Sequence, residues 1–148
     1  MVFVALPALQ RNQRDTQRRN DAALVKTALE NYKANNRGKY PWSHLVLGES
    51  AATIPKSDLD FFVNRYLDID GKFTSPTGEE YAIYGIIFGT FSNAWGFSGD
   101  GTSRINIFAN ANCASGGNVG WLSGARASKN KYAIRIGLET GKAYCLEG

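Results

Sequence analysis

The chain has 148 residues, which is enough for one domain of ordinary size and too few for two large ones. Hydrophobic residues make up 43% and charged residues 20%, and these fractions argue against a disordered chain and against a coiled-coil rod. The single histidine, His44, excludes a metal site with two histidines and argues against Ser-His-Asp and Cys-His catalysis.

The net charge of +4 is concentrated at the N-terminal end of the chain. Residues 1–39 contain eight Lys or Arg and three acidic residues, whereas residues 40–148 contain nine and ten. Residues 40–148 are therefore close to neutral in charge, which argues against nucleic-acid binding by the whole protein.

The chain opens on nine uncharged residues, MVFVALPAL. This segment is too short to cross a bilayer, which needs about twenty apolar residues. One interpretation is a strand or tail that folds into the core. The other is the remaining end of a longer apolar segment.

A long helix is predicted after this start. Residues 8–36 contain no Gly and no Pro and are rich in good helix formers. Gly38 lies where a left-handed C-cap is expected, and Pro41 prevents the helix from resuming. Pro7 fits the first turn or marks a kink. The helix would have about 30 residues and a length of roughly 45 Å.

The two halves of this helix differ in composition. The C-terminal half carries an apolar stripe at helical spacing, which predicts packing on a globular body. The preceding residues 10–21, QRNQRDTQRRND, contain no apolar side chain except the methyl group of Thr16. We expect residues 10–21, the stem of the helix, to project from the body. Other chains or a membrane must then cover the stem and the apolar residues 1–9 at its tip. The stripe consists of Ala22, Val25, Ala28, Leu29 and Tyr32.

The remainder predicts an α+β body with an antiparallel meander. Residues 42–56 form a connector, and Ser57 is expected to cap a short helix that contains Leu59 to Leu67. Strands are predicted at 81–88, 104–109 and 132–138, and Thr140-Gly141 is predicted to turn the chain into a last strand at 142–146. The expected organisation is a spine helix over residues 1–38 and a globular head over residues 39–148.

Three segments together resemble type IV pilins. ALPALQRNQRDTQRRNDAALVKTALENYKANNRGKYP looks like the helical spine of a pilin, up to the Gly-x-Tyr-Pro that closes it. FTSPTGEEYAIYG is similar to the P-x-G-x-x-Y stretch that opens the pilin sheet. KYAIRIGLETGKAYCLEG resembles the closing strand and the disulfide-bounded loop of major pilins. A pilin's leader-cleavage glycine, first aromatic residue and early glutamate have no counterpart, so we expect the chain to begin partway along the pilin helix.

The resemblance implies a pilin-like fold and a structural function. Pilins are held in the cytoplasmic membrane by the apolar helix end and are then assembled into a helical filament on the cell surface. The implied partners are further copies of the chain, the pilus assembly machinery and host-cell or other surfaces, with no specific nucleic acid and no cofactor. The residues implied to pack in the filament are Val2, Phe3, Val4, Leu6, Pro7 and Leu9.

Two cysteines, Cys113 and Cys145, allow one disulfide. Closing a loop of about 33 residues would contribute roughly 3–4 kcal/mol in the chain-entropy model, and it would indicate an oxidising compartment. A pair of reduced, buried thiols is the alternative. The residues between the cysteines are rich in Ser, Gly and Asn, which predicts an exposed loop with Trp121 as an anchor or a contact residue.

Other sites have weaker support. Asp68-x-Asp70-Gly71 resembles part of an EF-hand loop, but Tyr66 and Thr77 occupy the first and last ligand positions, so a turn without metal is expected. No motif groups residues for catalysis, and we expect no enzyme activity. Arg11, Arg14, Arg18 and Arg19 could bind phosphates, but direct binding of the helix to DNA is disfavoured because the stem has no interleaved aromatic residues.

Two alternatives to a pilus subunit remain at the level of the sequence. A pseudopilin of a type II secretion system shares the helix and the sheet but usually has calcium ligands in place of the disulfide loop. A soluble binding module would use the basic helix to contact an acidic partner.

Overall fold

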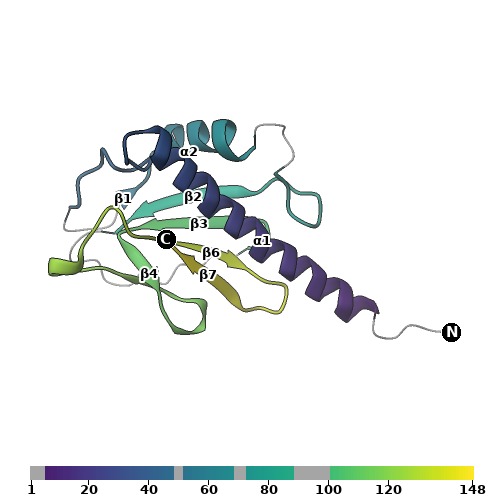
Figure 1. Ribbon diagram of the computed structural model, residues 1–148. Coiled ribbons are helices and arrows are strands. Elements are labelled where there is room, and N and C mark those ends of the chain that lie inside the picture. The colour runs from purple at the N-terminus through teal and green to yellow at the C-terminus, as the bar shows by residue number, and fades with distance from the viewer. Residues whose placement is uncertain (1–5, 49–51, 69–72, 89–100) are drawn as a thin grey trace.

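The computed structural model is an α+β fold in which one long helix lies across a five-stranded sheet (Figure 1). The structure describes residues 6–48, 52–68, 73–88 and 101–148. The sheet order is β1-β2-β3-β6-β7, with strands β1 (Ala52–Thr53), β2 (Ala82–Ile87), β3 (Arg104–Ala109), β6 (Tyr132–Gly137) and β7 (Ala143–Glu147). A separate hairpin consists of β4 (Ala111–Cys113) and β5 (Val119–Trp121).

Helix α1 spans Leu6–Asn35, close to the predicted bounds. Its predicted end is confirmed: Gly38 has a φ of 77°, and its N–H donates to the Lys33 carbonyl at 2.9 Å. This is the left-handed geometry that glycine adopts without a steric penalty after a helix.

The prediction of an all-antiparallel meander is wrong at one pair of strands. β2 and β3 are parallel, with Ala82 opposite Arg104 and Ile87 opposite Ala109. Parallel neighbouring strands need a long crossover connection. The chain between Ile87 and Arg104 is long enough to return to the end of the sheet at which β2 begins. The other three pairings of the sheet are antiparallel, including the predicted hairpin of β6 and β7.

The second helix also starts differently from the prediction. α2 spans Lys56–Phe62 and continues as a π-helical turn, Val63–Leu67. Pro55 occupies the N-cap position, and no side chain caps the helix, so the cap expected at Ser57 is not formed. Proline has no N–H to leave unpaired and a φ near that of a helix, so it can start the helix itself.

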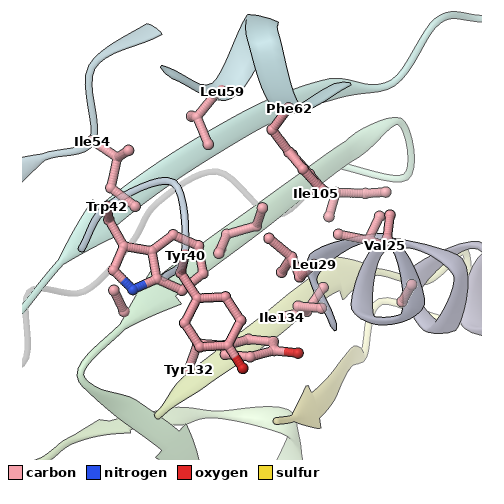
Figure 2. Packing of buried hydrophobic residues seen from close by; sticks show 14 of the residues in the cluster. Val25, Leu29, Tyr40, Trp42, Ile54, Leu59, Phe62, Ile105, Tyr132 and Ile134 are labelled. Atoms are coloured by element: carbon pink, nitrogen blue, oxygen red, sulfur yellow. The ribbon is translucent and has the colours of Figure 1, made fainter. Parts of the chain in front are cut away.

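The core lies between α1, α2 and one face of the sheet. Figure 2 shows Val25 and Leu29 of α1 beside Ile105 and Ile134 of the central strands, with Leu59 and Phe62 of α2 nearby. Trp42 stacks on Tyr40 with ring centroids 5.0 Å apart, and Tyr132 packs edge-on against both rings. A smaller cluster on the other side of the sheet contains Phe88, Phe108, Ala111 and Ala133.

Candidate functional site: the long helix and its surroundings

The C-terminal half of α1 packs on the head through its apolar stripe. Ala22, Val25, Ala28 and Leu29 are buried in the core cluster. Tyr32 is half-buried against the aromatic rings of the second helix, with its ring centroid 6.1 Å from that of Phe62. The structure therefore brings all five stripe residues to one contact surface.

The expectation that residues 10–21 project without packing is wrong for the second part of that stem. Asp15, Arg18 and Asp21 are buried, and the Arg18 side chain is 0% exposed. Arg18 Nη1 lies 3.1 Å from Asp15 Oδ1, and Arg18 Nη2 lies 3.3 Å from Glu139 Oε1. Arg18 Nε also donates to the Thr102 carbonyl at 2.9 Å. Polar groups dock this part of the helix on the head because most of their charges and hydrogen bonds are matched, although the buried Asp15 Oδ2 has no hydrogen-bond partner among the described residues.

Glu139 lies in the turn between β6 and β7 and accepts from two arginines of the helix. Arg14 donates from Nε and Nη2 to the two carboxylate oxygens of Glu139, both at 2.8 Å. Asp15 Oδ1 accepts from the Glu139 backbone N–H at 2.9 Å. The hydrogen bond from Arg14 lowers the pKa of Glu139, and the same contact raises the pKa of Arg14.

Two further carboxylates of α1 accept from tyrosines of the head. Asp21 Oδ2 accepts from the Tyr81 hydroxyl at 2.6 Å, and burial of Asp21 raises its pKa despite this bond. Glu30 Oε1 accepts from the hydroxyls of Tyr40 and Tyr132, each at 2.8 Å. Desolvation of Glu30 is the largest single influence and opposes ionisation, but the two bonds and the charges of Lys33 and Lys26 together outweigh it and lower the pKa of Glu30.

The outer face of α1 has an unusual composition. The charged residues of the helix lie on the sides that face or flank the head, with the exposed Arg19 and Glu30 at the border, while the exposed residues at helical spacing on the far side are uncharged. A helix face that remains in water normally carries charged side chains. The uncharged outer face consists of Leu6, Leu9, Gln13, Thr16, Gln17, Asn20, Ala23, Leu24, Thr27, Asn31, Ala34 and Asn35.

The start of the helix extends past the head, as Figure 1 shows. Leu6 and Leu9 are 49% and 52% exposed, and Pro7 is exposed in the first turn. Val2, Phe3 and Val4, the other residues predicted to pack in a filament, lie outside the described residues. Among the described residues, no helix combines the length and apolar composition that crossing a bilayer requires.

The predicted disulfide is confirmed between Cys113 of β4 and Cys145 of β7, with Cα atoms 5.8 Å apart. It joins the small hairpin to the edge of the main sheet. Cys113 N–H also donates to Glu147 Oε2 at 3.0 Å. The loop is exposed to half-buried over residues 114–130, as its composition predicted, and it contains β5 and two 3₁₀ turns, Ser115–Gly117 and Gly124–Arg126.

Asn110 holds this loop in place, a role that no local sequence pattern indicates. The side chain is fully buried, and Nδ2 donates to the carbonyls of Phe88 and Leu122 at 3.0 and 2.9 Å. Oδ1 accepts from the Ser128 N–H at 2.7 Å. The backbone of Asn110 has a φ of 56°, a left-handed conformation that asparagine tolerates better than most residues. Trp121 is half-buried against the smaller core cluster and therefore acts as an anchor of the loop.

The remaining predicted sites are spread apart. Asp68 Oδ1 accepts from the Phe73 N–H at 2.8 Å, while residues 69–72 of the EF-hand-like segment lie outside the described residues. Within the described part of the chain, no cluster of three His, Cys, Asp or Glu could hold a metal ion. Of the four stem arginines, Arg14 and Arg18 are paired with Glu139, and Arg19 lies over the Tyr144 ring at 5.8 Å.

Comparison with known proteins gives no relative: no family model, no curated protein and no solved structure matches this chain.

Proposed function

We propose that this chain is a structural subunit of a type IV pilus, a surface filament assembled by packing of its N-terminal helices. The single observation that carries this proposal is the uncharged outer face of α1, which is exposed over the whole helix. Further support comes from the resemblance of the sequence to pilins and from the arrangement of a long helix, a mostly antiparallel sheet and a disulfide near the C-terminus.

An uncharged face suits contact between identical chains. Burying a charged side chain without a partner costs several kcal/mol, and like charges on identical faces would repel one another. Amide and hydroxyl groups such as those of Gln13, Thr16 and Asn20 can instead hydrogen-bond to their equivalents in a neighbouring copy. The apolar side chains of Leu6 and Leu9 would gain by burial at the filament axis, by about 1.5–3 kcal/mol for each fully buried side chain.

The proposal includes a location and partners. The subunit would lie in the cytoplasmic membrane before assembly and in a surface pilus afterwards, where the heads would contact host cells or other surfaces. The filament would serve adhesion, twitching motility or DNA uptake.

The test is electron microscopy of cells that express the protein, with mass spectrometry of sheared filaments. We expect filaments that contain this chain. The double variant Leu6→Asp/Leu9→Asp should abolish them and leave the melting temperature of the head nearly unchanged. Unfolding of the head in this variant would mean that the tip belongs to the core, and filaments without this chain would contradict the proposal. A calcium-dependent melting temperature would favour a pseudopilin.

A further inference from the structure

A cavity of about 550 Å³ lies beside α1, at the end of the sheet where β6 begins and β7 ends. Lys26 of α1, Arg126 of a 3₁₀ turn and Lys131 before β6 line it, together with Ala111, Leu122 and Glu147. Its position is fixed by the backbone, since Tyr132 and Gly148 exchange N–H to carbonyl hydrogen bonds of 3.3 and 3.0 Å next to it. The volume falls in the range of small-molecule sites.

The cavity has more positive than negative charge. Three cationic side chains, Lys26 from the helix and the nearby pair Arg126 and Lys131, meet one carboxylate side chain, Glu147, which already accepts from the Cys113 N–H. An α-carboxylate at Gly148 would still leave an excess of positive charge. Within the described residues, no ion pair involves the side chains of Lys26, Arg126 or Lys131. This concentration is local, because residues 40–148 as a whole have a slight excess of acidic residues.

The lining combines these cations with an apolar wall. Leu122 is half-buried and forms the accessible part of this wall, whereas Ala111 behind it is 1% exposed. A guanidinium presents a planar set of donors that matches phosphate oxygens, and ammonium groups add mobile positive charges. An apolar wall offers a surface for the carbon face of a ring.

We propose that this cavity binds a small phosphate-bearing ligand, with the phosphate at Arg126, Lys131 and Lys26 and a sugar-like ring against Leu122. The site is separate from the outer face of α1, so it does not depend on filament assembly. Its ligand chemistry is that of a sugar phosphate.

The test is an NMR titration of the full-length chain with glucose 6-phosphate at low ionic strength. We expect saturable amide shifts clustered at residues 111–112, 122–126 and 131. Inorganic phosphate should bind the same residues more weakly, and glucose should not shift them. The variant Arg126→Gln/Lys131→Gln should weaken binding about tenfold or more, because two charge-assisted hydrogen bonds are lost.

Arg65→Gln is the matched control, since Arg65 is an exposed cation on the second helix, away from the cavity. It should bind glucose 6-phosphate with unchanged affinity. The NMR spectrum of each variant reports whether the fold is intact. Absence of saturable shifts, equal weakening by the control variant, or shifts spread over all exposed cations would overturn the phosphate site. Equal affinity for inorganic phosphate would overturn the place assigned to the sugar ring.

Discussion

Arg18 and Glu139 are 121 residues apart in the sequence, yet Arg18 Nη2 lies 3.3 Å from Glu139 Oε1 in a site where the arginine side chain has no solvent exposure. This pair extends the contact between helix and head beyond the apolar stripe and into the polar stem. The angle at which α1 leaves the head is therefore set by charged groups as well as by apolar packing.

We expect Glu139→Gln to destabilise the protein by about 1–3 kcal/mol, because the buried Arg18 would lose a charged partner. Asp15 still neutralises Arg18 in this variant, which limits the loss. Urea unfolding measures the change. Glu79→Gln removes an exposed carboxylate elsewhere on the head and should leave the midpoint unchanged. Equal effects of the two substitutions would contradict the role assigned to Glu139.

Acid stability should depend on the same carboxylate. The pKa of Glu139 is lower in the folded than in the unfolded protein, so its contribution is fully present above the unfolded pKa and is lost as pH falls through the folded pKa. Glu30 behaves in the same way, whereas the raised pKa of Asp21 has the opposite sign. We expect Glu139→Gln to flatten the acid side of the stability profile below about pH 5, as measured by ΔG from urea unfolding at each pH. An unchanged slope would show that other groups dominate.

The burial of the stem was predictable in part from the sequence. Positions 15, 18, 22, 25 and 29 follow one another at spacings of three and four, so the apolar stripe continues directly into Asp15 and Arg18. A search for apolar residues alone does not detect this continuation, because two of the five residues, Asp15 and Arg18, are charged. The partner Glu139 could not be found from local patterns, since the contact joins residues at opposite ends of the chain.

The strand segments and the disulfide were predictable for a different reason. Alternation and turn residues act locally, so the bounds of β3, β6 and the hairpin to β7 follow from neighbouring residues. The parallel pairing of β2 with β3 depends on where a long connection returns the chain, which no local pattern encodes. The role of Asn110 is similarly hidden, because its partners come from two separate segments, Phe88 directly after β2 and Leu122 and Ser128 in the loop after β5.

Asn110 should be a sensitive position in the head. Asn110→Ala would leave the Phe88 and Leu122 carbonyls and the Ser128 N–H without this partner and would place alanine at a positive φ. We expect a loss of about 2–4 kcal/mol. Asn110→Gly removes the same hydrogen bonds without the backbone strain, so it should be destabilised less than the alanine variant. If both variants unfold at the wild-type urea concentration, the asparagine does not hold the loop.

The disulfide should be complete in the native protein. Thiol labelling under non-reducing conditions should find no free cysteine, and reduction should lower stability by roughly 3–4 kcal/mol in the chain-entropy model. Cys113→Ala/Cys145→Ala gives the same loss without a reducing agent. Two reactive thiols in the native protein, or a double variant as stable as the wild type, would contradict a structural role for the bond.

Leu24, on the outer face of α1, is the position at which a substitution best distinguishes an effect on filament assembly from an effect on the stability of the head. This residue is 53% exposed and lies on the side of the helix away from the head. Leu24→Glu would put a charge on the proposed contact between copies, where burial without a partner costs several kcal/mol. The head loses little, since the side chain is not part of its core. We therefore expect an unchanged melting temperature and far fewer surface filaments.

Val46→Glu is the matched control for Leu24→Glu. Val46 is an apolar residue of the head that is 84% exposed and lies off the helix, so the same new charge stays in water there. Filament number, counted by electron microscopy and normalised to the amount of the protein in the cells, should be close to wild type for Val46→Glu. Equal filament numbers in the two variants would mean that the uncharged face of α1 does not form the contact between copies, and the main support for a filament subunit would be lost.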